Sequence, residues 1–407
     1  MKTIDLQSLN LIKSKKIYFY GLCVITEHVK KGAEYHNLKI EGVFDTTINN
    51  QNINDKKNFG LKIISQENLL NVEKDSIFLI TCSHYFSVER HLNSLGFYNV
   101  FDSCFLVKEH LEKSNLDKEE YRAVNRTHSA LLEKKNYINK QFDKFTIPSL
   151  DLILTEKCSL KCADCANLMP YFESPKDSDL DTMLSNLDII LEKVDSITEL
   201  RILGGEPFLF RKISEVLKYS LSQKKIPNIV IYTNGTIVPR AETLEYLIND
   251  KIILEITNYG KLSRNFDKLI TTCKEKKINY LIRDLGESWD DSANIIKPSR
   301  SKEQDQRIFE ECCAKYLFTL MHGKIYRCPF SASIDALKKI ELNDNNSQII
   351  NKDLSKEELE KFIYGTAFVD SCRFCQGRSK ILSRVKPARQ SKIIREPYKV
   401  IEGTDIN

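Results

Sequence analysis

The stretch Cys158-Ser-Leu-Lys-Cys162-Ala-Asp-Cys165 decides how the rest of the chain is interpreted. Its three thiols follow a C-x3-C-x2-C spacing directly after an apolar run at 150–154, which we predict to be a β-strand. Three thiolates on one short loop are suited to hold three irons of a 4Fe–4S cube and to leave the fourth iron open. The alternative is a zinc knuckle, which normally needs a fourth Cys or His nearby, and none follows closely here.

The composition is that of an ordinary soluble protein long enough for two or three domains. Of its 407 residues 42% are hydrophobic and 29% charged, and a net charge of +5 does not by itself indicate nucleic-acid binding. The N-terminus has no apolar signal region, and no run reaches the roughly 18 apolar residues of a membrane span. We therefore expect a cytoplasmic protein with neither a membrane nor a nucleic acid as partner. In a reducing compartment cysteines are more often metal ligands or catalytic groups than disulfides.

Residues 1–110 alternate strand-like and helix-like segments, which predicts a small parallel, Rossmann-like sheet. Its strands are expected at 16–20, 38–44, 76–81 and 98–101. Asp45 follows the second strand, where dinucleotide-binding folds carry their ribose-binding acid. The glycine fingerprint of those folds is missing after Gly21. Nucleotide binding and a docking or scaffold role both stay open for this domain.

Beyond a helical linker predicted at 111–147, residues 148–300 repeat a strand–helix unit. Such repeats predict a partial (β/α)6 barrel, whose chemistry lies at the carboxyl ends of its strands. The cysteine loop, Gly204-Gly-Glu-Pro207 and Thr233-Asn-Gly235 each follow a predicted strand. We therefore expect these three turns to share one mouth of the barrel.

With these motifs in order, residues 150–290 resemble the radical S-adenosylmethionine enzymes. The resemblance implies a 4Fe–4S cluster with an open iron on Cys158, Cys162 and Cys165. It also implies that the Gly-Gly-Glu-Pro turn meets the methionine amino group and that an Asn contacts the ribose, since glycines let a backbone approach closely and a carboxylate suits an ammonium. The implied S-adenosylmethionine-binding residues are Gly204, Gly205, Glu206, Pro207 and Asn234.

The resemblance implies a reaction, and the sequence departs from the family pattern at one position. The chemistry is one-electron cleavage of S-adenosylmethionine to methionine and a 5′-deoxyadenosyl radical, which abstracts a hydrogen atom from a substrate. A reductant such as flavodoxin or ferredoxin is the implied partner. Asp164 stands where many of these enzymes have an aromatic residue near the adenine. Tyr171 and Phe172 are the alternatives for that contact.

A second cysteine set lies in residues 301–380. Cys313, Cys328, Cys372 and Cys375 form the pattern C-x9-G-x4-C…C-x2-C. This pattern resembles the auxiliary-cluster domains called SPASM and twitch, and four ligands fit the shorter twitch form with one closed auxiliary 4Fe–4S cluster. Electron transfer is its implied role, and a zinc ribbon is the alternative.

The remaining cysteines receive structural interpretations. Cys312 is taken as a spare thiol, with substitution as a ligand or hydrogen donation as alternatives. Small buried hydrophobes are expected at Cys23, Cys82, Cys104 and Cys273.

Substrate contacts are predicted after the later barrel strands. Tyr259, Arg283 and Trp289 are placed to face the mouth, where a guanidinium suits a phosphate or carboxylate and an indole suits a sugar ring; packing and local pairing are the alternatives. The tail 381–407 lies in a basic region and is interpreted as a solvated end, with the lining of an anionic site as the alternative.

The chain is thus predicted to be α/β, with an N-terminal Rossmann-like domain, a partial (β/α)6 radical S-adenosylmethionine barrel and a small C-terminal twitch or SPASM-like domain. It resembles radical enzymes found with polysaccharide-biosynthesis functions, which implies an oxidoreductase or epimerase acting on a sugar, cyclitol or nucleotide-activated sugar. One alternative is a SPASM-type peptide maturase, although residues 1–110 do not resemble its winged helix. The other is a non-catalytic iron–sulfur or S-adenosylmethionine-binding protein. The sequence names no catalytic residue.

Overall fold

The structure is a computed structural model, and it forms two compact units, Met1–Gln141 and Phe142–Asn407. The residues it describes are 2, 4–22, 25–45, 59–82, 85–113, 144–284, 289–291, 294–312, 314–365, 367–377 and 384–391. Most of the predicted linker, Cys23, Cys313 and most of the tail fall outside them. Among the described helices, none combines the length and the apolar character needed to span a bilayer.

The first unit is built on a parallel sheet, as the sequence predicts, and the sheet has five strands where four were expected, because the short β3 was not predicted. Its strand order is β3-β2-β1-β4-β5, and every neighbouring pair is parallel. The strands are β1 (Ile17–Tyr20), β2 (Ile40–Phe44), β3 (Ile63–Ile64), β4 (Ile77–Ile80) and β5 (Val100–Asp102). The winding reverses between β1 and β4, which is the topological switch point of doubly wound folds.

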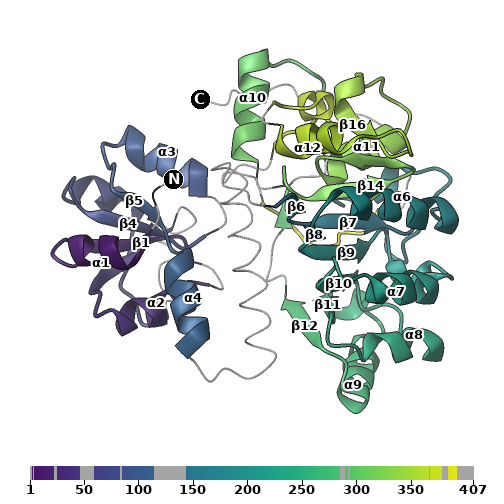
Figure 1. The fold of residues 1–407 in the computed structure, drawn as a ribbon, viewed down its shortest axis with the longest axis horizontal. Helices are drawn as coiled ribbons and strands as arrows, with labels where there is room; N and C mark the ends of the chain where they lie inside the picture. The colour runs from purple at the N-terminus through teal and green to yellow at the C-terminus, as the bar shows by residue number, and fades with distance from the viewer. Residues whose placement is uncertain are drawn as a thin grey trace. The chain divides into compact units, whose positions relative to one another are not determined.

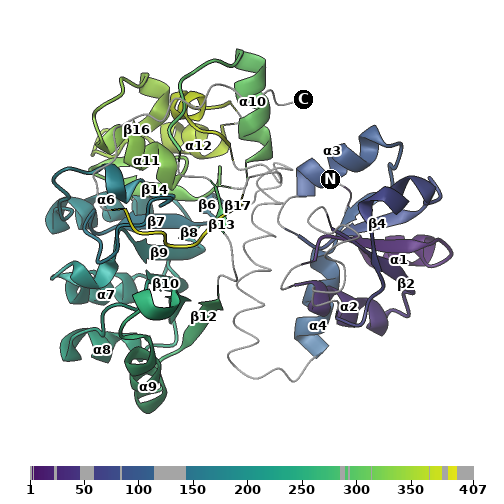
Figure 2. The ribbon, with the colours of Figure 1, turned by 180° about the vertical axis from the view of Figure 1, so that it is seen from behind.

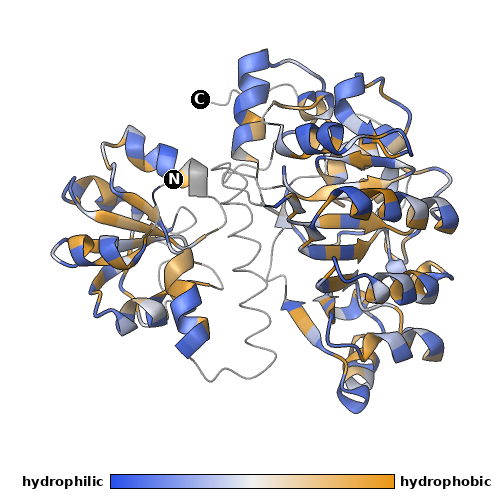
Figure 3. Ribbon diagram, viewed as in Figure 1, coloured by the Kyte–Doolittle hydropathy of each residue, from blue (hydrophilic) through white to orange (hydrophobic). Residues whose placement is uncertain are grey.

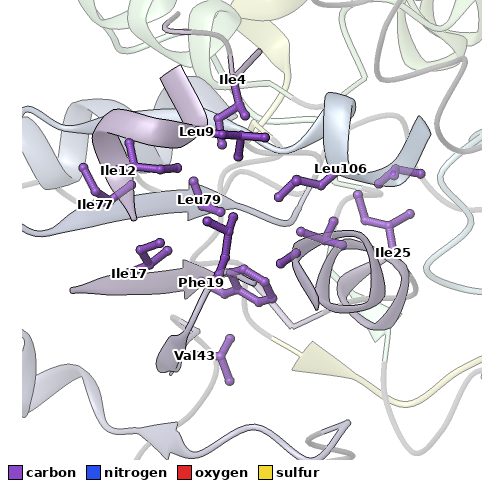
Figure 4. Close-up of a cluster of buried hydrophobic side chains, with 14 of the residues drawn as sticks. Ile4, Leu9, Ile12, Ile17, Phe19, Ile25, Val43, Ile77, Leu79 and Leu106 are labelled. Atoms are coloured by element: carbon purple, nitrogen blue, oxygen red, sulfur yellow. The ribbon is translucent and has the colours of Figure 1, made fainter. Parts of the chain in front are cut away.

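Helices cover both faces of this sheet (Figure 1, Figure 2). They are α1 (Leu6–Ile12), α2 (Thr26–Tyr35), α3 (Tyr85–Ser94) and α4 (Cys104–Lys113), with a 3-10 turn at Gln66–Asn71. Because side chains alternate along a strand, β1 contributes to two cores. Ile17 and Phe19 enter one core together with Leu106 of α4 (Figure 4). Tyr20 enters the other, opposite Val88 of α3.

The loop after β1 is held by packing and by its own hydrogen bonds. Gly21 has a φ of +108°, and a Cβ there would lie 2.5 Å from the Cys82 Cβ, so the loops after β1 and β4 touch. The Asp45 carboxylate accepts the Leu22 N–H at 2.6 Å, and the Thr26 hydroxyl donates to the Gly21 carbonyl at 3.2 Å. Asp45 therefore has a structural role here, and nucleotide binding by this unit stays a prediction.

The second unit carries an eight-stranded sheet in the order β12-β11-β10-β9-β7-β14-β15-β16. The run from β7 to β12 is parallel: β7 (Leu150–Ile153), β9 (Glu199–Leu203), β10 (Asn228–Thr233), β11 (Ile252–Asn258) and β12 (Tyr280–Asp284). The intervening helices are α6 (Leu180–Lys193), α7 (Ile213–Ser222), α8 (Ala241–Leu247) and α9 (Phe266–Lys276). The predicted strand–helix rhythm is therefore confirmed, and in Figure 3 hydrophobic residues concentrate on the strands.

The other edge of this sheet joins the C-terminal cysteine region to the parallel strands β7 to β12. β14 (Phe318–Met321) pairs in parallel with β7, and β15 (Lys324–Tyr326) and β16 (Ser347–Ile349) continue antiparallel. The two-residue turn between β14 and β15 has φ values of +49° at His322 and +77° at Gly323, as tight hairpin turns require. The region expected to be a separate small domain thus shares one sheet with the strands that carry the cysteine loop and the Gly-Gly turn.

Shorter elements complete the second unit. They are β6 (Thr146–Ile147), β8 (Ser196–Ile197), β13 (Trp289–Asp290), β17 (Arg384–Val385), α10 (Lys302–Glu311), α11 (Pro329–Ala336), α12 (Lys356–Tyr364), and 3-10 turns at Met169–Tyr171, Pro207–Leu209, Gly260–Leu262, Asp344–Asn346 and Asp370–Phe374. β13 and β17 form a two-stranded antiparallel ladder that ties the chain's last described segment to the region after β12.

Candidate active site

The cysteine loop and the Gly-Gly turn are joined backbone to backbone at the carboxyl ends of β7 and β9. The Gly205 N–H donates to the Thr155 carbonyl at 2.8 Å, and the Glu206 N–H donates to the Lys157 carbonyl at 2.9 Å. A Cβ on Gly204 would lie 2.3 Å from the Thr155 carbonyl oxygen, and one on Gly205 would lie 2.2 Å from that of Lys157. Both glycines are therefore needed for the two loops to touch.

Glu206 ties the Gly-Gly turn to the Asn turn. Its side chain is fully buried, and its carboxylate accepts the Thr233 hydroxyl at 2.9 Å, the Asn234 N–H at 2.9 Å and the Phe208 N–H at 3.2 Å. Burial raises the pKa of Glu206 to about 7, and these hydrogen bonds oppose it. An ammonium group that approached this carboxylate would have to share it with the chain's own donors.

The buried carboxyl of Glu206 predicts a pH-dependent stability. Since its pKa is raised from 4.5 to about 7, folding favours the protonated form, and this contribution is lost as the pH rises through about 7. We expect the free energy of unfolding of metal-free protein to fall by on the order of 3 kcal/mol between pH 5 and 8 from this group. Urea unfolding should show a flatter pH profile for Glu206→Gln than for wild type. The exposed Glu245→Gln should keep the wild-type profile, and an equal profile for all three proteins would contradict the assignment.

The Asn turn is also bonded to the cysteine loop. The Asn234 amide donates to the Ser159 hydroxyl at 3.1 Å and lies 3.7 Å from the Cys158 sulfur. Its oxygen accepts the Thr236 hydroxyl at 2.6 Å, and the Ser159 and Thr236 hydroxyls are 2.5 Å apart. Sequence reasoning missed Ser159 and Thr236, although Ser159 lies inside the cysteine spacing.

The three loop cysteines share one apolar cluster. Leu160, Cys162 and Ala388 are its buried members, and Cys158, Cys165, Tyr259, Leu262 and Trp289 pack against it. Burial raises the pKa of Cys158 to about 12 and that of Cys162 to about 11, and the neighbouring cysteines add to both shifts. Soft thiols gathered in an apolar cluster fit a bound iron–sulfur cluster, whose positive irons would favour the thiolates. In the described part of the chain, no three His, Cys, Asp or Glu side chains converge on a single-ion position.

Two of the three predicted substrate residues lie at this cluster. Tyr259 and Trp289 pack edge to face with ring centroids 5.6 Å apart, and both contact the cysteine cluster. Arg283 instead forms an ion pair with the buried Glu255 at 2.5 Å, and 56% of its side chain is exposed. The sequence reasoning did not single out Glu255.

A second charge pair, in which both side chains are largely buried, joins neighbouring strands of the sheet. Arg201 of β9 contacts Asp151 of β7 at 3.1 Å, and its guanidinium lies 4.8 Å from the centroid of the Tyr232 ring. Asp151 and Arg201 were not singled out from the sequence, because each is a charged residue flanked by apolar residues within a strand.

Asp164 has a partner that the sequence did not suggest. Its buried carboxylate faces the Arg389 guanidinium at 3.3 Å. Tyr171 and Phe172, the alternatives for an adenine contact, are buried in two different apolar clusters. Residues 384–391 do not form the solvated end expected for them, because they pair with β13 and with the cysteine loop.

The C-terminal cysteines gather at a second place in the same unit. Burial raises the pKa of Cys372 well above its usual value, and nearby Cys328, Cys375 and Cys312 add to the shift. The Cys328 sulfur accepts the Ser331 N–H at 3.4 Å, at the start of α11. The Cys375 sulfur accepts the Gly377 N–H at 3.3 Å. The predicted ligand Cys313 lies outside the described residues.

A mostly buried guanidinium supports the turn that carries two of these cysteines. Arg300 donates to the Cys372 carbonyl at 2.7 Å and to the Cys375 carbonyl at 2.8 Å, and Asp305 holds it from the other side at 2.8 Å. Of the cysteines expected in cores, Cys104 and Cys273 are buried and Cys82 packs partly buried against a core cluster.

No family model matches the chain. Among curated proteins, the GTP 3',8-cyclase of Clostridium acetobutylicum is 27% identical in a 156-residue alignment that covers 33% of this chain and 48% of that protein. The GTP 3',8-cyclase of Mycolicibacterium smegmatis is 34% identical over 98 residues, which are 24% of this chain and 27% of that protein. The chain spans less than half the length of the curated relatives it matches.

Solved structures give weaker likenesses. BtrN in complex with AdoMet and 2-DOIA is 18% identical, with a TM-score of 0.36, and the match covers 58% of this chain and 95% of that one. SuiB of Streptococcus suis bound to S-adenosylmethionine is 18% identical, with a TM-score of 0.30, over 56% of this chain and 48% of that one. The curated relatives and the cysteine loop with its two bonded turns show that the chain belongs to the radical S-adenosylmethionine superfamily.

Proposed function

We propose that this chain cleaves S-adenosylmethionine reductively at the cysteine loop and uses the resulting radical to abstract a hydrogen atom from a small molecule. One observation carries the proposal: three loops at the carboxyl ends of neighbouring parallel strands are bonded into a single rim. Glu206 links the Gly-Gly turn to the Asn turn, and Ser159 links the Asn turn to the cysteines. This rim brings together the thiols of the cysteine loop, the backbone of the glycine turn and the polar side chains of the Asn turn.

In this proposal Cys158, Cys162 and Cys165 hold a 4Fe–4S cluster with an open iron. When bound, the cluster and S-adenosylmethionine supply one-electron chemistry that yields a 5′-deoxyadenosyl radical, with flavodoxin or ferredoxin as reductant. The chain's own part is to bind, orient and exclude water. Gly204 and Gly205 let the Gly-Gly turn pack against the cysteine loop, and the apolar cluster with Tyr259 and Trp289 limits water at the cysteines.

The proposed substrate is a sugar, a cyclitol or a nucleotide-activated sugar, which the chain would oxidise or epimerise. Support comes from the curated relatives, which are named as cyclases of the nucleotide GTP. It comes also from Trp289, which packs with Tyr259 against the cysteine cluster and whose indole suits a sugar ring, whereas Arg283 is paired with Glu255. The alternative is a peptide substrate, because SuiB is recorded with a precursor peptide.

Deuterium transfer separates these two substrates. Reduced protein is incubated with S-adenosylmethionine and either deuterated nucleotide sugars or deuterated forms of any peptide encoded next to its gene. Mass spectrometry then measures deuterium in 5′-deoxyadenosine. We expect transfer from a nucleotide sugar. If deuterium is transferred from the peptide alone, the substrate is a peptide and the proposal of a sugar substrate is wrong.

We further propose that Cys328, Cys372, Cys375 and a thiol of the 312–313 pair hold an auxiliary 4Fe–4S cluster for electron transfer. Cys328→Ala is then expected to lower the iron content from about eight to about four per chain. The matched variants Cys312→Ser and Cys313→Ser identify the fourth ligand, because only the ligand's variant should lose iron. Elemental analysis checks these iron contents. A wild-type protein that holds zinc and only about four irons would contradict an auxiliary cluster.

A further inference from the structure

The segment 388–391 lies against the cysteine loop in an antiparallel pairing. The Ala163 N–H donates to the Arg389 carbonyl at 2.6 Å, and the Ser391 N–H donates to the Lys161 carbonyl at 2.7 Å. Cys162 and Gln390 are the facing pair between these two bonds. The middle cysteine of the loop is therefore held by a piece of chain from the other end of the sequence.

Upstream of this segment, the β13–β17 ladder pairs Val385 with Trp289. Trp289 and Ala388 belong to the same apolar cluster as the loop cysteines. The start of the segment is thus anchored beside the site by strand pairing, and Ala388 fills part of its wall.

The side-chain amide of Gln390 is oriented by three contacts. Its oxygen accepts the Lys161 N–H at 2.8 Å, and its nitrogen donates to the Ala388 carbonyl at 2.7 Å. With the oxygen used by a donor and the nitrogen facing an acceptor, the amide cannot be flipped. The same nitrogen lies 3.5 Å from the Cys162 sulfur and directs an N–H toward it.

The neighbouring residue adds an ionic contact. The Arg389 guanidinium faces both oxygens of the buried Asp164 carboxylate, at 3.3 and 3.4 Å. Asp164 lies between the second and third cysteines of the loop, so backbone, amide and guanidinium contacts all fall on the turn Lys161–Cys165.

We propose that residues 388–391 form a wall of the cysteine-loop site, and that Gln390 is a positioning residue whose amide donates to the Cys162 thiolate when the cluster is bound. The inference rests on the proposed function, because it needs a cluster at this loop. Hydrogen bonds to cysteine sulfurs are one of the factors that set the reduction potential of iron–sulfur clusters. A donor stabilises the more negative, reduced form, so Gln390 raises the potential and makes the cluster easier to reduce.

Two substitutions remove the donor in different ways. Gln390→Glu keeps an oxygen for the Lys161 N–H and loses the N–H donor, whereas Gln390→Leu loses both without adding a charge. The control is Lys386→Gln, which lies two residues before the wall, is exposed, and like Gln390→Glu lowers the net charge by one. Iron content and the midpoint potential are measured on the full-length protein. The potential comes from a redox titration followed by electron paramagnetic resonance, using the signal that is missing in Cys162→Ala.

Both Gln390 variants are expected to shift the potential to more negative values, and Lys386→Gln is expected to keep it. From the net strength of one hydrogen bond, the ratio of reduced to oxidised cluster at a fixed potential should fall about three- to tenfold. That fold-change corresponds to about 30 to 59 mV for a one-electron couple. Loss of iron from the Gln390 variants but not from Lys386→Gln, with unchanged thermal unfolding of the metal-free proteins, would also support a wall formed by residues 388–391.

Two results overturn the inference. One is an unchanged potential in both Gln390 variants. The other is equal loss of iron in the Gln390 variants and in Lys386→Gln, which would reveal a general weakness of the C-terminal segment. A wild-type protein that binds no cluster at the loop fails differently, because it overturns the proposed function itself.

Discussion

Gly205→Ala is expected to destroy the assembled rim of the site. A Cβ at this position would lie 2.2 Å from the Lys157 carbonyl oxygen and 2.8 Å from the Cys158 Cβ. Relief requires a shift of the cysteine loop away from the Gly-Gly turn, which would break the bond from the Glu206 N–H to the Lys157 carbonyl. Overpacking of this kind typically costs about 1–3 kcal/mol. We expect a lower thermal midpoint, loss of the loop cluster and no binding of S-adenosylmethionine, measured by iron analysis and calorimetry.

Gly260→Ala is the matched control for this substitution. Gly260 has a φ of +60° and no atom within 4 Å of an added Cβ, so the exchange costs only the strain of a left-handed residue. That strain is about 1–2 kcal/mol. If Gly205→Ala retained iron and bound S-adenosylmethionine as well as Gly260→Ala does, the close contact between the two loops would have no functional importance.

Cys162→Ala is expected to remove the loop cluster while leaving the fold intact. The substitution deletes one of three thiols in the apolar cluster, and two thiolates cannot hold three irons of a cube. The iron content should fall from about eight to about four per chain, and S-adenosylmethionine should no longer change the paramagnetic resonance signal. A small loss of packing free energy accompanies the change, as for any buried cysteine.

Cys273→Ala controls for that packing loss. Cys273 is completely buried in α9, away from both cysteine sets, and removing its sulfur leaves a comparable small void. This variant should keep the full iron content and the response to S-adenosylmethionine. Full iron content in Cys162→Ala as well would show that the loop does not hold the cluster.

The parallel sheets and the positions of the loops could be predicted from the sequence. Apolar runs such as 199–203 and 228–232 are strands buried on both faces, and each is followed by a turn with glycine or asparagine. Carboxyl ends of neighbouring parallel strands meet at one edge, so the shared mouth followed from the order of the motifs. The hydrophobic pattern therefore predicted the parallel sheets and the shared edge at which the three turns lie.

The contacts across the site could not be predicted in the same way. The pairing of Gln390 with Cys162 joins residues 228 positions apart, through a short segment with no periodic pattern. Asp164 looked like a departure within the cysteine loop, and only the fold shows that it faces Arg389. The role of Glu206 as a bridge between two turns likewise depends on the distance between their backbones. Local sequence does not contain that information.

Formation of 5′-deoxyadenosine tests the central claim most directly. Wild-type protein is reconstituted with iron and sulfide under anaerobic conditions, reduced with dithionite and given S-adenosylmethionine, and the products are measured by mass spectrometry. We predict that 5′-deoxyadenosine and methionine form in equal amounts with wild type and that neither forms with Cys162→Ala. A wild-type protein that binds about eight irons and never forms 5′-deoxyadenosine, with or without candidate substrates, would contradict the account and favour a non-catalytic cluster protein.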